Sequence, residues 1–141
     1  MKGRIYRFMS DPLFQFGFGL SYTTFSIGDA KLNKTSLKEG ESLELTIPVK
    51  NSCKRNGTEI VQVYIYKVND IDGPIKTLKG FKRVNVAAGK TGQAVINLPN
   101  TSFEFYNRAN RKMEIAAGDY EVLYGNSSNA KDLNMIKITI Q

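Results

Sequence analysis

The stretch IVQVYIY, from Ile60 to Tyr66, is apolar at every position except Gln62. A run of this length that is rich in β-branched and aromatic residues is typical of a strand. A strand with one solvated face shows polar residues at alternate positions, and this stretch does not. It therefore predicts a central strand that is covered on both faces.

Four further segments alternate apolar with mostly polar residues at the two-residue period of a strand. They are Leu43–Val49, Ala94–Leu98, Tyr120–Tyr124 and Ile136–Ile140, and turns rich in glycine and polar residues separate most of them. Pro48 lacks an amide proton, so the first segment is either an edge strand or has Pro48 where no ladder bond is needed. Several short strands at this spacing predict an all-β antiparallel sandwich.

Two local signals refine this prediction. Gly118 and Tyr120 form the G-x-Y arrangement that opens the sixth strand of many immunoglobulin-like folds, where the phenol bonds a nearby backbone group. A plain buried tyrosine is the alternative. We expect helix only as a turn or two within Thr101–Asn107, capped by Thr101 or Ser102, with Glu104 in its first turn.

The composition limits the chemistry that the chain can perform. Its 141 residues fit one domain, and 41% hydrophobic and 23% charged residues are typical of a globular protein. There is no histidine, so Ser-His and Cys-His nucleophile pairs are excluded, and the single cysteine, Cys53, cannot form an internal disulfide. We also expect no membrane span, because no apolar run approaches about 20 residues, and no signal peptide in MKGRIYRFMS.

The segment DPLFQFGFGLSYTTF, from Asp11 to Phe25, precedes these strands. Phe14, Phe16 and Phe18 recur every second residue, so an extended backbone would present all three rings on one side. Such a segment is suited to lie as a strap against another surface. An ordinary first strand of the domain is the alternative.

This segment resembles the PLFPFGYGLSYT signature that leads into the last domain of family 3 glycoside hydrolases, with Gln15 in place of a proline. Three further motifs follow in the order of that family: LKGFKRV at Leu78–Val84, SFEFYN at Ser102–Asn107 and AAGDYEVLYGNSS at Ala116–Ser128. The resemblance covers nearly the whole chain. What it resembles is the C-terminal fibronectin type III-like domain of β-glucosidases and β-xylosidases.

The resemblance implies an extended lead-in and docking strap over residues 1–25 and an immunoglobulin-like (fibronectin type III-like) β-sandwich over residues 26–141. It implies that Phe14, Phe16, Phe18 and Tyr22 dock on the catalytic domains of a parent glycosidase. The family's catalytic aspartate and glutamate belong to earlier domains, so we expect no catalytic residue, cofactor or metal in this chain. Without the parent, the strap is expected to mediate self-association.

Two polar features have simple interpretations. Asn69, Asp70, Asp72 and Gly73 resemble part of a calcium loop, but the distal bidentate glutamate is missing, which favours a surface turn. The net charge of +7 includes Lys76, Lys79, Lys82 and Arg83 around Phe81. With Phe81 expected to point inward, this strand would have a charged outer face, which favours docking or solubility over nucleic-acid binding.

A carbohydrate-binding module is the alternative function. Such modules stack sugar rings on exposed aromatic side chains and bind the hydroxyl groups with amides and charged groups. The candidate sugar contacts are Tyr106, Asn107 and Arg111, while the absence of tryptophan weighs against a sugar site.

Overall fold

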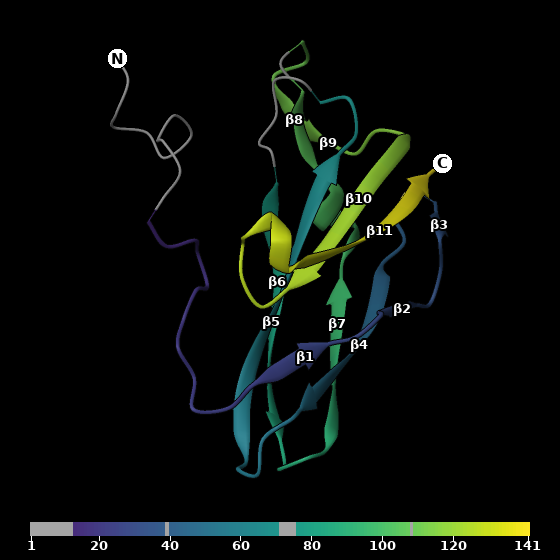
Figure 1. The fold of residues 1–141 in the computed structure, drawn as a ribbon. Coiled ribbons are helices and arrows are strands. Elements are labelled where there is room, and N and C mark those ends of the chain that lie inside the picture. Colours follow the sequence, from purple (N-terminus) through teal and green to yellow (C-terminus); the bar gives the residue numbers. More distant parts are fainter. Residues whose placement is uncertain (1–12, 39, 71–75, 108) are drawn as a thin grey trace.

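The computed structural model describes residues 13–38, 40–70, 76–107 and 109–141 and confirms the β-sandwich (Figure 1). In the first sheet, β4 (Leu43–Asn51) pairs with β7 (Thr91–Leu98) on one side and with β1 (Phe25–Ile27) and β2 (Lys31–Leu32) on the other. The second sheet has the order β3-β11-β10-β5-β6, with bounds Ser36–Leu37, Leu133–Ile140, Gly118–Gly125, Gly57–Lys67 and Thr77–Val86. Pairing is antiparallel except between β3 and β11.

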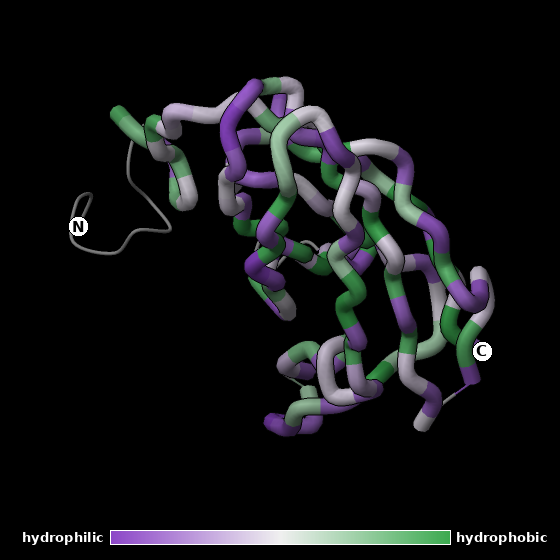
Figure 2. Tube along the Cα trace, turned by 90° about the horizontal axis from the view of Figure 1, so that it is seen from below, coloured by the Kyte–Doolittle hydropathy of each residue, from purple (hydrophilic) through white to green (hydrophobic). Residues whose placement is uncertain are grey.

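The core lies between the two sheets and is built from the predicted alternating positions. The inward residues of β4, β7 and β10 are buried, as are Ile138 and Ile140 of β11, whereas Ile136 is partly buried. Hydrophobic and hydrophilic positions alternate along the strands in Figure 2. β5 is the exception. Its residues Val61–Ile65 are buried without interruption, as expected for a strand with β6 and β10 on its two sides and cover on both faces.

Pro48 lies in the middle of the first sheet, so the edge-strand alternative is wrong. β1 leaves β4 after the pair Ile27–Val49, and β2 rejoins it at Lys31–Thr46. The Pro48 carbonyl accepts a hydrogen bond of 2.9 Å from the Gly28 amide in this gap. Because the N–H and C=O of one residue point to the same neighbouring strand, the missing amide proton also faces the gap. Pro48 therefore sits where no ladder bond is needed, which was the other alternative.

The tyrosine corner is confirmed. The Tyr120 side chain is buried, and its hydroxyl donates a 2.8 Å hydrogen bond to the Ala116 carbonyl. Gly118 between them has φ of 132°, a conformation that glycine adopts without the strain of a side chain. Burial raises the pKa of the Tyr120 phenol, so it remains a neutral donor.

The expected helix is shorter than predicted. A 3-10 turn spans Asn100–Phe103 and has no side-chain cap from Thr101 or Ser102, and Glu104 follows it as the C-cap instead of lying in its first turn. The chain then enters a small hairpin of β8 (Phe105–Asn107) and β9 (Lys112–Glu114) at one end of the sandwich (Figure 1). A second 3-10 turn spans Ala130–Asp132. In the described part of the chain, no helix is long and apolar enough to cross a membrane.

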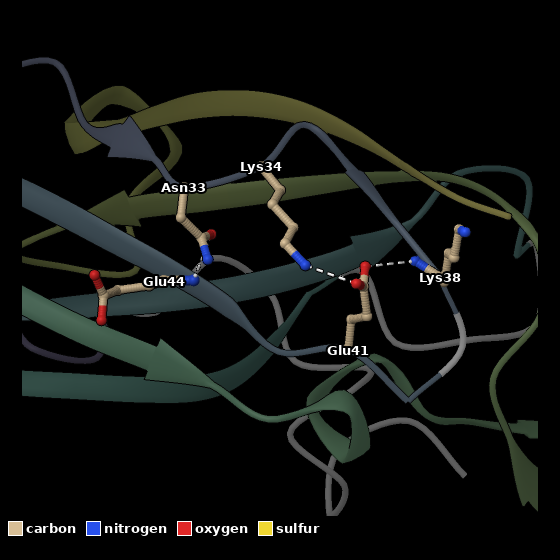
Figure 3. A network of polar contacts seen from close by, with 5 residues as sticks. All are labelled: Asn33, Lys34, Lys38, Glu41 and Glu44. Carbon is tan, nitrogen blue, oxygen red and sulfur yellow. Dashed lines mark hydrogen bonds and ion pairs between the residues drawn. The ribbon is translucent and has the colours of Figure 1, made fainter.

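An ion pair fixes the turn between β3 and β4 (Figure 3). The Lys34 ammonium lies 2.6 Å from the Glu41 carboxylate, which also accepts a 3.0 Å hydrogen bond from the Lys38 amide. The Asn33 side chain accepts a 2.9 Å hydrogen bond from the Glu44 amide. The hydrogen bond from Lys34 is the main cause that lowers the pKa of Glu41, and the Lys38 amide adds to it.

Replacing Tyr120 with phenylalanine should lower the free energy of unfolding by about 0.5–1.5 kcal/mol, because one hydrogen bond is lost while the ring packing on Phe103 is kept. Urea denaturation followed by circular dichroism measures this change. Tyr106→Phe, on the exposed hairpin, is the matched control and should leave the midpoint unchanged. An unchanged midpoint for Tyr120→Phe would mean that the corner bond contributes nothing.

Titration of the Glu41 carboxyl, followed by NMR, should give a pKa below the ordinary glutamate value. A lowered pKa in the folded state stabilises the fold above the unfolded-state pKa, and this contribution disappears as the pH falls through the folded value. Lys34→Gln should move the Glu41 titration upward, whereas Lys31→Gln on β2 should not. A Glu41 titration that does not respond to Lys34→Gln would contradict the ion pair.

Candidate docking surface

The strap, defined here as the described segment Leu13–Thr24, lies outside both sheets and runs beside the sandwich before β1 (Figure 1). It contains a β-turn, since the Phe18 amide donates a 2.9 Å hydrogen bond to the Gln15 carbonyl. Gly17 has φ of 84°, which is the value required at the third position of a type II turn. The prediction of an unbroken two-residue alternation is therefore wrong for Phe14–Phe18. Asp11 lies outside the described residues.

The turn changes how the strap presents its rings. Phe14 and Phe18 stack on each other with ring centroids 5.0 Å apart, while Phe16 occupies the turn itself. Phe14, Phe16, Phe18 and Tyr22 are exposed by 64, 67, 55 and 97%, respectively. None of the twelve strap residues carries a charge. The predicted docking residues thus form an uncharged, aromatic and solvent-facing surface.

A hydrogen bond attaches the strap to the second sheet. The Ser128 amide, in the loop after β10, donates a 2.7 Å hydrogen bond to the Phe16 carbonyl. The next residue, Gly17, lies so close to β5 that an added Cβ would be 2.1 Å from the Gln62 side-chain nitrogen. The positive φ of Gly17 favours glycine, and any larger residue would also have to displace the end of the Gln62 side chain.

The loop that holds the strap is itself held by polar side chains on the outer face of this sheet. The Gln62 amide donates a 3.3 Å hydrogen bond to the Asn126 carbonyl and accepts one from the Tyr64 hydroxyl. Lys76 donates to the Ser128 carbonyl, and its ammonium lies 5.5 Å from the centre of the Tyr64 ring. Burial lowers the pKa of Lys76 and raises that of Tyr64. No sequence motif identified this network.

The other end of the strap is attached to the turn between β4 and β5. The Thr24 carbonyl accepts a 3.0 Å hydrogen bond from the Ser52 amide, and the Thr24 amide donates to the Cys53 sulfur at 3.1 Å. Cys53 thus accepts a backbone hydrogen bond at the point where the strap enters β1.

Phe81 lies on the outer face of β6, so the prediction that it points inward is wrong. Val84 and Val86 are buried, and an added Cβ on Gly80 would meet Ile96 and Leu98 of the opposite sheet. Residues at odd positions from Phe81 onward therefore face outward, and Phe81 is 68% exposed. A β-bulge at Val63/Tyr64 shifts the register before this point. The outer face is aromatic as well as cationic.

The candidate sugar contacts lie together on the hairpin of β8 and β9. Tyr106 is 56% exposed and pairs with Met113. The Asn107 amide group donates to Glu114, and its oxygen accepts a 2.9 Å hydrogen bond from the Ala109 amide. Arg111 has φ of 52° in the turn. The three residues share one hairpin, but Tyr106 and Asn107 are consecutive in β8, so their side chains point to opposite faces. The polar groups of Asn107 already have partners.

The calcium-like segment is described only in part. Asn69, with φ of 68°, and Asp70 lie in the turn after β5, whereas Asp72 and Gly73 fall outside the described residues. Among the described residues, no group of three or more Cys, Asp or Glu side chains is arranged to hold a metal ion.

Comparison with known proteins places the chain in a family. Residues 59–128 match the model of the fibronectin type III-like domain. The chain is 46% identical over 140 residues to a xylan 1,4-β-xylosidase of Xylanibacter ruminicola, covering 99% of this chain and 16% of that enzyme. It is 34% identical over 119 residues to the thermostable β-glucosidase B of Acetivibrio thermocellus, covering 84% of this chain and 16% of that enzyme.

Solved structures similar to this chain are also β-glucosidases. The β-glucosidase of Listeria innocua in complex with glucose aligns with a TM-score of 0.83 and 31% identity over 92% of this chain and 18% of the enzyme. A β-glucosidase involved in saponin metabolism from intestinal bacteria aligns with a TM-score of 0.86 and 28% identity over 99% of this chain and 20% of the enzyme. The chain thus spans a fifth or less of the length of these relatives. It belongs to the fibronectin type III-like domains of family 3 β-xylosidases and β-glucosidases.

Proposed function

We propose that this chain is a non-catalytic accessory domain that packs against the catalytic domains of a family 3 β-xylosidase or β-glucosidase. The observation that carries the proposal is the strap, an uncharged segment with exposed rings that is attached to the sandwich through the Ser128–Phe16 hydrogen bond. Large contiguous apolar surfaces on soluble proteins mark interaction sites.

The energetics favour a docking role for the strap. Transfer of each phenylalanine ring from water to a protein interior contributes about 1.5–3 kcal/mol. The strap is attached at Phe16 and at Thr24 before any partner arrives, and such preorganisation lowers the entropic cost of binding. The rings of Phe14, Phe16 and Phe18 are therefore presented to a partner on a fixed backbone.

The sugar-binding alternative has less support in the structure. Among the described residues of the hairpin, Tyr106 offers an exposed aromatic ring, but Asn107 uses its amide within the hairpin. Tyr64 and Tyr124 are buried, so their rings are not exposed for stacking on a sugar. The Tyr124 hydroxyl also accepts a 2.9 Å hydrogen bond from the Ala30 amide.

The purified chain should not hydrolyse aryl β-xylosides or aryl β-glucosides, because the proposed role leaves the catalytic carboxylates to other domains. Chromogenic substrates measure this directly. Activity that follows the chain through successive purification steps would contradict the accessory role.

Calorimetric titration with xylo- and cello-oligosaccharides tests the sugar-binding alternative. We expect no saturable isotherm, and a saturable isotherm that is abolished in Tyr106→Ala would favour the sugar-binding module instead.

The isolated chain should self-associate in a concentration-dependent way, because its strap rings have no catalytic partner to cover them. Phe14→Ser combined with Phe16→Ser should shift sedimentation velocity profiles toward the monomer. Tyr106→Ser combined with Met113→Ser, which removes exposed apolar side chains from the hairpin, is the matched control. Equal association in both double variants would show that the strap is not the contact.

A further inference from the structure

A second apolar surface lies beside the strap on the outer face of β5 and β6. The outward-facing cross-strand pairs are Thr58–Asn85, Ile60–Arg83, Gln62–Phe81 and Tyr64–Leu78. Ile60, Leu78 and Phe81 are exposed, although they are large hydrophobic residues. We name Ile60, Leu78, Phe81 and Arg83 the β5–β6 face.

This face is continuous with the strap. A groove is lined by Gly17–Ser21 of the strap on one side and by Thr58–Ile60, Gln62 and Arg83 of the sheet on the other. The contact of Gly17 with Gln62, which pairs with Phe81, places strap and face side by side. A partner that covers the strap rings therefore also reaches the β5–β6 face.

The outward-facing pairs of this face carry positive charge only. Among its four outward-facing pairs, Arg83 carries the one charge and there is no carboxylate. In the described part of the chain, no carboxylate lies within ion-pair distance of Arg83. The neighbouring groove does hold two carboxylates, Glu59 and Asp132, which accept hydrogen bonds from the Ile60 amide (2.9 Å) and the Ser127 hydroxyl (2.7 Å), respectively. In the described residues neither forms an ion pair with Arg83.

We infer that the β5–β6 face docks on a carboxylate-bearing, apolar surface of the catalytic part of the same polypeptide, with Arg83 pairing with the carboxylate and Phe81 filling an apolar pocket. This inference rests on the proposed function and extends its interface beyond the strap. Arginine binds a carboxylate through two parallel hydrogen bonds, and aromatic residues with arginine dominate the energetics of interfaces.

The charge argues against a second copy as the occupant of the β5–β6 face itself, as distinct from association of the isolated chain through the strap rings. A two-fold contact brings the same patch of both copies together, and the outward-facing pairs of this patch hold Arg83 but no carboxylate to pair with it. Like charges opposed across an interface are unfavourable. The relatives, in which this region makes up 16–20% of the protein, contain a much larger catalytic part that can supply the opposite charge.

The test is cysteine labelling in an assembled protein. The chain replaces the aligned region of the Xylanibacter ruminicola xylan 1,4-β-xylosidase, and Cys53→Ser removes the internal thiol. Phe18→Cys reports on the strap, Phe81→Cys on the β5–β6 face, and Tyr106→Cys on the distant hairpin. Maleimide labelling rates are compared between the isolated chain and the chimera. At least tenfold slower labelling at positions 18 and 81, with little change at 106, is the expected result.

The labelling pattern distinguishes docking through the strap from docking through the β5–β6 face. Slow labelling at position 18 with unchanged labelling at 81 would overturn this inference and leave the strap as the docking element. Unchanged labelling at both positions would overturn the proposed function as well. If the chimera does not fold, the same three cysteines at the aligned positions of the complete Xylanibacter ruminicola enzyme give the same readout.

The charge is tested separately in the chimera. Arg83→Glu should lower the thermal unfolding midpoint of the chimera without changing that of the isolated chain. Arg83→Lys should lower the midpoint of the chimera by a smaller amount, because lysine keeps the charge but cannot form two parallel hydrogen bonds to a carboxylate. Lys82→Glu is the matched control, since Lys82 directly precedes Arg83 in the same strand and pairs with the inward-facing Val61. Equal effects of Arg83→Glu and Lys82→Glu would contradict a carboxylate partner at Arg83.

Discussion

The two-sided burial of β5 is the constraint on which the rest of this structure depends. Val61, Val63 and Ile65 face the core, where burial of apolar side chains stabilises the contact between the two sheets. Gln62 and Tyr64 face outward and are buried as well. Buried polar atoms must be hydrogen-bonded, and among the described residues none is left without a partner. The outer side of β5 therefore needs a cover that supplies polar groups.

The loop after β10, together with Lys76, supplies that cover, and the strap is attached to the same loop. Gln62 bonds the Asn126 carbonyl, Lys76 bonds the Ser128 carbonyl, and the Ser128 amide bonds Phe16. One network thus satisfies the centre of the sheet and also positions the strap. The aromatic surface is held at a defined place on the sandwich although it contributes no side chain to the core.

The sequence predicted those parts of the fold that depend on periodicity. Alternation at Leu43–Val49 and the continuous apolar run at Ile60–Tyr66 were sufficient to predict the two central strands, because burial imposes these patterns on each strand separately. The G-x-Y arrangement predicted the Tyr120 corner for the same local reason. The helix predicted at Thr101–Asn107 was too long, because the hairpin partner of β8 lies outside that segment.

The geometry of the candidate docking surface was predicted less well, because it depends on register and on contacts that are distant in sequence. The type II turn at Gly17 breaks the alternation of Phe14, Phe16 and Phe18, although a glycine between two aromatic residues was a signal for a turn. The prediction placed Phe81 inward as an aromatic residue between Lys79 and Arg83, whereas the alternation with the buried Val84 and Val86 places it on the outer face. The approach of Ser128 to Phe16 joins residues more than a hundred positions apart, and no local pattern reports it.

The central claim is that the strap lies on the outside of a complete sandwich and exists for a partner. Equilibrium unfolding of the chain without residues 1–21 tests it most directly, since this deletion removes the three phenylalanine rings and the Ser128–Phe16 bond but leaves β1 and the core intact. We predict a cooperative transition. Its free energy of unfolding should fall by about 0.5–1.5 kcal/mol at most, which is the contribution of one hydrogen bond. A truncated chain that is unfolded in buffer would show that the strap belongs to the core of the domain, and it would contradict the docking role.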